Sequence, residues 1–155
     1  ASLHLVGYCL SSVGEFAAAR PWFERAVAEA ERGDVHGRVD HARLGVSLYQ
    51  VGYCLSGVGE FAAARPWYER AVAEAEQGDV HGRVDHESLG ASLHLVGYCL
   101  SSVGEFAAAR PWYERAVTEM ERGDVFGRVT AENLAIARRS LARCIAAIAA
   151  SPDAD

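Results

Sequence analysis

The chain has 155 residues, half of them apolar and 23% charged, a composition that suits a folded protein and excludes a disordered one. All 15 strongly basic residues are arginine, and 21 acidic residues bring the formal net charge to -6, which argues against a nucleic-acid partner. No apolar run approaches the roughly 20 residues that a membrane-spanning helix needs. We therefore expect neither a nucleic-acid nor a membrane partner.

The sequence repeats itself with a period of 45 residues. Residues 1–34 match residues 91–124 at 31 of 34 positions, and residues 1–45 match residues 46–90 at 37 of 45. Self-similarity at such a period is typical of repeat architectures. The predicted units are repeat one (1–40), repeat two (41–85), repeat three (86–130), a capping helix (131–150) and a tail (151–155), all in one solenoid over residues 1–155.

The first helix of each repeat is predicted from a cap and an apolar stripe. In repeat three it covers about 86–102, and the carboxylate of Asp85 can accept hydrogen bonds from the free N–H groups of its first turn. Leu or Val recurs at i, i+4, i+7 and i+11 from Leu89, which marks one face of a helix. Val84 and Leu89 fit a hydrophobic staple. The same pairing recurs in Val39 with Leu44 and in Val129 with Leu134.

The second helix of repeat three is predicted over 106–122, and Gly123 follows where a helix-ending glycine would stand. Pro111 lies inside it, although an interior proline costs up to about 3 kcal/mol. The alternative is a helix that begins at the proline. Because Phe106 and Ala109 continue the apolar stripe of Tyr113, we predict one helix with a slight bend at each proline.

The last predicted helix, 131–150, departs from the repeat. Cys144 keeps the 45-residue register of Cys99, but polar side chains replace Leu93, His94, Leu95 and Tyr98 of repeat three. A polar face is what a solubilising cap requires. The replacements are Arg138, Arg139, Ser140 and Arg143.

These residues resemble the tetratricopeptide repeat (TPR) family in all three repeats. Its pattern of bulky residues, small residues and aromatics is filled in repeat three by Leu93, Val96, Gly97, Leu100, Gly104, Phe106, Ala109, Tyr113 and Ala116. Two departures are Leu93 in place of the usual Trp and the lack of a Pro after the second helix. The long period, and the segment Gly82–His86 before the first helix, are similar to arrays of kinesin light chains and bacterial signalling NTPases.

The resemblance implies an all-α superhelix of three helix-turn-helix repeats plus a capping helix, in which the first helices line a concave groove. Repeats one and two differ at eight positions, and four of these lie on that surface, which is either tuned to a ligand or has drifted. The predicted groove residues are His4, Leu5, Tyr8, Ser12, Tyr49, Gln50, Tyr53, Ser56, His94, Leu95, Tyr98, Ser101, Ser102, Arg139 and Arg143.

Two features of this predicted groove stand out. Tyr8, Tyr53 and Tyr98 would form an aromatic ladder, either as contact area for a partner or as packing between helices with the hydroxyl at the edge. Arg139 and Arg143 would close the groove, either holding a peptide carboxylate or solvating the cap. Relatives that hold acidic C-terminal peptides use a basic groove, whereas here repeats one to three are expected to offer no groove arginine, so that function is not expected.

The four cysteines recur once per 45 residues. Equivalent atoms of adjacent helix pairs should lie on the order of 10 Å apart, beyond the ~7 Å between Cα atoms that a disulfide tolerates. We therefore predict free, buried, inert thiols and a reducing, cytoplasmic location.

Catalytic and metal sites are not expected. The pairs His36/His41 and His81/His86 suggest metal ligands, but they flank capping aspartates, and repeat three carries Phe126 instead of the first histidine. Every candidate polar residue recurs by repetition, whereas an active site needs one asymmetric constellation. We predict no catalytic residue, no metal and no cofactor.

Function is therefore expected to be binding. The favoured hypothesis is a non-enzymatic scaffold that takes a protein or peptide partner in the concave groove. A second is a structural, engineered or recently amplified array without a ligand of its own, and a third is the sensor fragment of a larger signalling NTPase. Near-identical repeats also favour end-to-end or swapped self-association.

Overall fold

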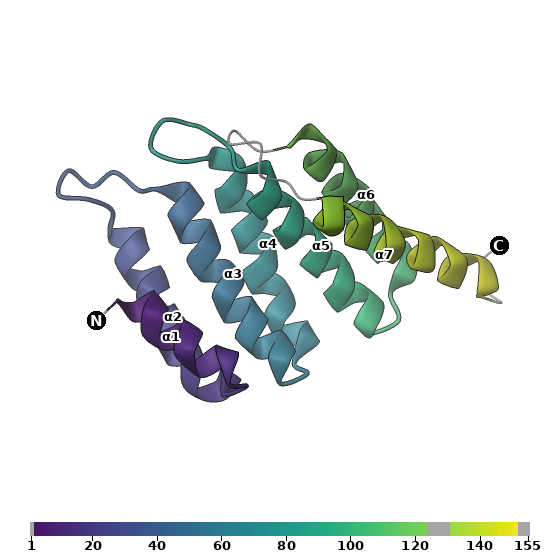
Figure 1. The fold of residues 1–155 in the computed structure, drawn as a ribbon, viewed down its shortest axis with the longest axis horizontal. Helices are drawn as coiled ribbons and strands as arrows, with labels where there is room; N and C mark the ends of the chain where they lie inside the picture. Colours follow the sequence, from purple (N-terminus) through teal and green to yellow (C-terminus); the bar gives the residue numbers. More distant parts are fainter. Residues whose placement is uncertain (1, 124–130, 152–155) are drawn as a thin grey trace.

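The computed structural model describes residues 2–123 and 131–151, and every regular element within those residues is a helix. Consecutive helices pack against one another in two layers, with the first helix of each repeat and α7 in one layer and the second helices in the other (Figure 1). This confirms the predicted all-α repeat superhelix. The helices are α1 (Leu3–Ser12), α2 (Phe16–Arg32), α3 (His41–Gly57), α4 (Phe61–Gln77), α5 (His86–Ser102), α6 (Phe106–Arg122) and α7 (Ala131–Ala150).

The bounds of α5, α6 and α7 agree with the prediction because local signals set them. The Asp85 carboxylate accepts a hydrogen bond from the Ser88 backbone N–H at 3.1 Å, and Asp40 caps α3 in the same way. Helix α4, the second helix of the repeat that α3 begins, ends before Gly78. The φ of Gly78 is 82°, a left-handed conformation that glycine adopts without strain. Val129, which the sequence pairs with Leu134 in a predicted staple, lies outside the described residues.

Each of α2, α4 and α6 runs as a single 17-residue helix through its proline, as predicted. Pro21 and the residue four positions before it, Ala17, are both exposed in α2. The carbonyl that loses its helical partner can therefore bind water, which limits the cost of the interior proline.

The core is continuous along the array and depends on small residues facing large rings. Tyr68 of α4 is fully buried, and a Cβ atom added to Gly52 of α3 would lie only 2.9 Å from its ring. The Tyr113 ring stands in the same relation to Gly97, also at 2.9 Å. The small and aromatic positions of the repeat pattern thus have one physical cause, because the two helices of a pair approach closely only where glycine meets the ring.

The outer layer is joined from repeat to repeat by ion pairs. The Glu31 carboxylate of α2 contacts Arg70 of α4 at 2.9 Å, and Glu76 of α4 contacts Arg115 of α6 at 2.6 Å. The half-buried Trp112 packs against the core, with the Arg115 guanidinium 5.9 Å from its ring centroid. Within the described part of the chain, no helix combines the length and apolarity needed to cross a membrane.

Candidate functional site

The predicted groove residues all belong to α1, α3, α5 and α7. These four helices form one layer of the array (Figure 1). Tyr8, Tyr53 and Tyr98 are 44, 43 and 45% exposed, so each residue leaves nearly half of its surface open at equivalent positions of successive repeats. Each ring also makes an edge-to-face contact with a phenylalanine. The contacts join Tyr8 to Phe23, Tyr53 to Phe16 and Tyr98 to Phe61, with centroids 5.6, 5.7 and 5.6 Å apart.

The tyrosines therefore combine the two predicted roles, packing between helices and open contact area for a partner. One edge of each ring packs between helices, and the rest faces solvent in a fixed orientation. A ring that is already ordered loses little conformational entropy when a ligand covers it.

Gln50 has a different role from an open groove residue. It is only 9% exposed, and its side-chain amide donates a hydrogen bond to the Tyr8 hydroxyl at 2.9 Å. It thus joins α3 to α1. Repeats one and three carry leucine at this position, and Leu5 is 60% exposed while Leu95 packs partly against the core.

The histidines of this layer also connect neighbouring helices. The His4 imidazole Nε2 lies 3.0 Å from the Ser47 hydroxyl of α3, and the His94 Nε2 lies 2.8 Å from the Ser140 hydroxyl of α7. Burial lowers the pKa of both imidazoles below the ordinary value, and the nearby Arg43 charge adds to this effect at His4. In repeat two, Tyr49 replaces the histidine, and burial raises the pKa of its hydroxyl.

The serines on this layer form local hydrogen bonds. Ser56 and Ser101 are half-buried and share hydrogen bonds with the hydroxyls of Tyr68 (3.2 Å) and Tyr113 (3.1 Å) of the second helices. Ser12 is exposed and donates to a backbone carbonyl of α1 at 2.9 Å. In α5, the exposed Ser102 does the same within its own helix at 2.8 Å.

A cleft of about 360 Å³ lies between the N-terminal halves of α3 and α5. Its lining includes Tyr49 and Gln50, which were predicted groove residues. It also includes Arg43, which was not predicted to lie there. The expectation of a groove without arginine in repeats one to three is therefore wrong. Extending the helical period back from Val46 by three residues would have found Arg43, because residues three apart share a helix face. The remaining lining residues are Asp40, Ala42, Gly45, Val46, Ala75, Asp85, Ser88, Ala91 and Ser92.

Arg139 and Arg143 lie on α7, both exposed and four residues apart, so they share one face of the helix. Their neighbour Arg138 contacts Glu121 of α6 at 3.1 Å. Among the ion pairs that the described residues form, none includes Arg139 or Arg143. Two cations without an ion pair among the described residues thus stand at the α7 end of the tyrosine row.

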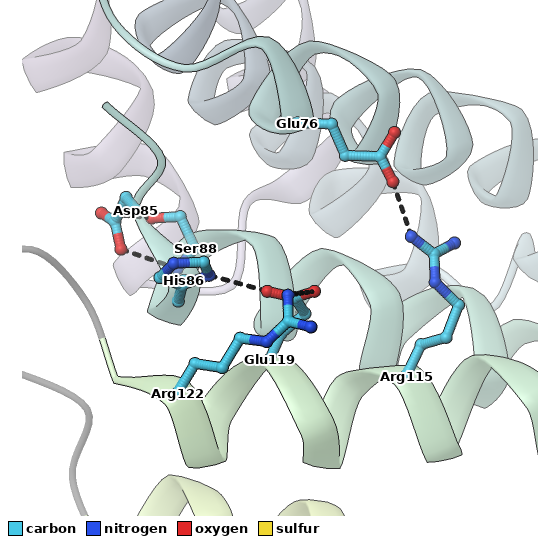
Figure 2. A network of polar contacts seen from close by, with 7 residues as sticks. All are labelled: Glu76, Asp85, His86, Ser88, Arg115, Glu119 and Arg122. Atoms are coloured by element: carbon cyan, nitrogen blue, oxygen red, sulfur yellow. Dashed lines mark hydrogen bonds and ion pairs between the residues drawn. The ribbon is translucent and has the colours of Figure 1, made fainter. Parts of the chain in front are cut away.

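Of the four histidines that suggested metal ligands, His41 and His86 pair with glutamates at the N-terminal ends of α3 and α5, whereas His36 and His81 donate backbone N–H bonds to Asp34 and Asp79. The His86 imidazole Nδ1 contacts the Glu119 carboxylate at 2.7 Å, and Arg122 contacts the same carboxylate at 3.0 Å (Figure 2). His41 and Glu74 repeat this pairing at 2.5 Å in repeat two. These contacts tie the first turn of a first helix to the last turns of its partner. No group of three potential metal ligands forms within residues 2–123 and 131–151.

The cysteines are free in the described residues, as predicted, but they are not all buried. Cys54, Cys99 and Cys144 are each 2% exposed, and burial raises the pKa of the Cys54 thiol to about 11, which keeps it protonated and unreactive. Cys9 is exposed, so the prediction of four buried thiols is wrong there. The later cysteines are covered by the second helix of the preceding repeat, and α1 has no such helix over it in the described residues.

Neither a protein-family model nor a curated protein matches this chain. Among solved structures, it is similar to nearly identical TPR-like repeats from Podosopora anserina, described as a kinesin light chain, and to a variant of the same repeats. The TM-scores are 0.71 and 0.72 at 20% identity, and the match covers 94% of this chain. The chain spans 65% of the length of each of those structures. This likeness of fold confirms the resemblance inferred from the repeat pattern, and the chain is by its fold a TPR-like repeat protein.

Proposed function

We propose that the chain is a non-enzymatic scaffold that binds a peptide or a partner domain in a groove along α1, α3, α5 and α7. The observation that carries the proposal is the row of Tyr8, Tyr53 and Tyr98, held by phenylalanine contacts and exposed to nearly the same extent. Tyrosine is enriched among the residues that dominate binding energy, because its ring combines apolar area with a polar tip.

The charges around the row favour a particular partner chemistry. Arg43 lines the cleft between α3 and α5, and Arg139 and Arg143 follow the last tyrosine on α7. We propose a partner segment with apolar or aromatic side chains along the tyrosines and an acidic group near α7, where two guanidinium groups can pair with it.

We further propose that residues 1–155 act as one solenoid with repeats 1–40, 41–85 and 86–130, the cap 131–150 and the tail 151–155. The free cysteines support a reducing location such as the cytoplasm. Binding in this proposal requires no catalytic residue, metal or cofactor.

A peptide library displayed on phage and selected on the immobilised chain would supply a ligand. The Tyr53→Ala/Tyr98→Ala double variant should then bind the selected peptide roughly 30-fold more weakly in calorimetry, since two such residues contribute about 1 kcal/mol each or more. The matched control is Arg70→Ala/Arg115→Ala, which alters only the outer layer and should bind unchanged. If the tyrosine double variant keeps its native helix content and binds the peptide unchanged, the groove is not the binding site. A selection that yields no binders would favour an array that lacks a ligand.

A further inference from the structure

One face of α1 is apolar and uncovered in the described residues, although the array covers the same face elsewhere. Residues 1–12 are identical to residues 91–102. In α5, Cys99 is 2% exposed beneath α4, whereas in α1 the equivalent Cys9 is exposed and Val6 is half-buried. The packing of α4 on α5 therefore shows which kind of helix would cover this face of α1.

The helix type that covers this face is also defined by the array. Helix α2 packs on α3, and α4 packs on α5. Helix α6 differs from α4 at three of 17 positions, which are Thr118, Met120 and Arg122. Helix α6 is therefore the helix of this chain that would best cover α1. In this structure α7 packs on α6.

Helix α7 makes a less complete match to α6 than a first helix would. The rings of Phe16 and Phe61 each contact a tyrosine of the next repeat edge-on, at 5.7 and 5.6 Å. At the register of that tyrosine α7 carries Arg143 instead. Tyr8 of a second copy would bring the missing ring to Phe106.

Charge points to the same pairing. In the outer layer, one ion pair recurs at equivalent positions from repeat to repeat, joining Glu31 to Arg70 and Glu76 to Arg115. The third glutamate of this series, Glu121, contacts Arg138 of α7, since no further second helix follows in the described residues. The first arginine of the series, Arg25, forms no ion pair among the described residues and instead lies 5.5 Å from the Trp22 ring centroid. Arg25 of a second copy would complete the series at Glu121.

We propose that α1 and α2 of one copy dock on α6 of a second copy and displace its α7, which joins copies head to tail. The contact is heterologous, so each added copy leaves a new free end and the assembly can extend. Helix α7 opposes this as a tethered competitor, with an effective concentration on the order of 1 mM. The native chain is thus held as a monomer at micromolar concentration, and assembly requires release of the cap. This interface is inferred independently of the proposed groove function, but release of α7 also moves Arg139 and Arg143 away from the end of the groove.

The test weakens the cap without touching either docking surface. Ala137 of α7 is 1% exposed, so Ala137→Glu should expel α7, and trypsin should then cut at Arg139 and Arg143 faster. Multi-angle light scattering should show a mass that rises at least twofold between about 1 and about 100 µM, while the wild type stays monomeric. Adding Cys9→Glu and Arg25→Glu, which change only the docking face of α1 and α2, should restore the monomer.

A milder variant keeps the test valid if Ala137→Glu lowers the helix content of the repeats. Arg138→Glu places a second negative charge beside Glu121 and leaves the apolar contacts of α7 in place. It should shift the mass in the same direction at higher concentration, and Arg25→Glu should reverse the shift. A strict monomer in a variant whose α7 is shown by trypsin to be released would overturn the proposal, as would assembly that survives the Cys9→Glu and Arg25→Glu changes.

Discussion

The side-chain amide of Gln50 donates a hydrogen bond to the hydroxyl of Tyr8 at 2.9 Å, which joins α3 to α1 across the boundary between repeats one and two. Leu95 stands at the same position in repeat three, so the equivalent bond to Tyr53 does not form there. The array therefore contains its own control for this contact.

Removing the hydroxyl of Tyr8 should be more costly than removing the amide. Tyr8→Phe leaves the 9%-exposed amide of Gln50 without its partner and should lower the free energy of unfolding by about 1–3 kcal/mol. Gln50→Leu replaces the amide by the residue of repeat three and should cost about 1 kcal/mol or less. Urea denaturation would measure both, with Tyr53→Phe as the control expected within about 0.5 kcal/mol of wild type. Equal losses for Tyr8→Phe and Tyr53→Phe would contradict this account.

A methyl group at Gly52 should destabilise the array. Its Cβ would lie 2.9 Å from the ring of Tyr68, which is fully buried and cannot move aside. Overpacking of this kind costs about 1–3 kcal/mol, which exceeds the helix-propensity gain of up to about 1 kcal/mol from glycine to alanine. Gly52→Ala should therefore lower the urea midpoint.

Gly57→Ser is the matched control. The Cβ there would lie 2.6 Å from the Phe16 ring, but Phe16 is only half-buried and can turn. Repeat three carries Ser102 at this position, so the repeat geometry accommodates the side chain. A larger loss for Gly57→Ser than for Gly52→Ala would show that the glycines are not placed by ring contacts.

Stability should fall at mildly acidic pH because of His94. Burial lowers the pKa of its imidazole below the ordinary 6.5, so the folded protein holds that proton less tightly than the unfolded chain does. The stabilising contribution is therefore complete above pH 6.5 and is lost as the pH falls through the lowered pKa. His94→Tyr, which copies Tyr49 of repeat two, should reduce this pH dependence in thermal unfolding.

The Asp79 carboxyl titrates in a different pH window. Hydrogen bonds from the backbone and side chain of Arg83 lower the pKa of the Asp79 carboxyl to about 2, so it stays ionised while His94 titrates. Identical slopes of melting temperature against pH for the wild type and His94→Tyr would show that His94 does not carry the effect.

The helices could be predicted from sequence because their determinants are local and occur three times. Asp85 marks the start of α5, the apolar stripe from Leu89 marks its face, and Gly123 marks the end of α6. Pro111 was the one conflicting signal, and the continued stripe on both sides of it indicated one helix. Stacking of the pairs followed from the single apolar face that each carries.

The candidate site was harder to predict because it depends on contacts between repeats. Gln50 was assigned to the groove surface, but the offset between α1 and α3 brings it under the Tyr8 hydroxyl. The repeat pattern predicts all four cysteines buried, but burial at this position comes from a preceding second helix, which Cys9 lacks among the described residues. Arg43 was missed because the predicted surface of repeat two stopped at Val46, one helical turn short of it.

The central claim, that a partner lies along the tyrosine row, is tested most directly by mapping a selected peptide on the isotope-labelled chain by NMR. The account predicts that shift changes gather on Tyr53, Tyr98, Arg139 and Arg143, with the outer-layer residues Trp67 and Arg115 unaffected. Shift changes confined to α4 and α6, with the tyrosine signals unmoved, would contradict it.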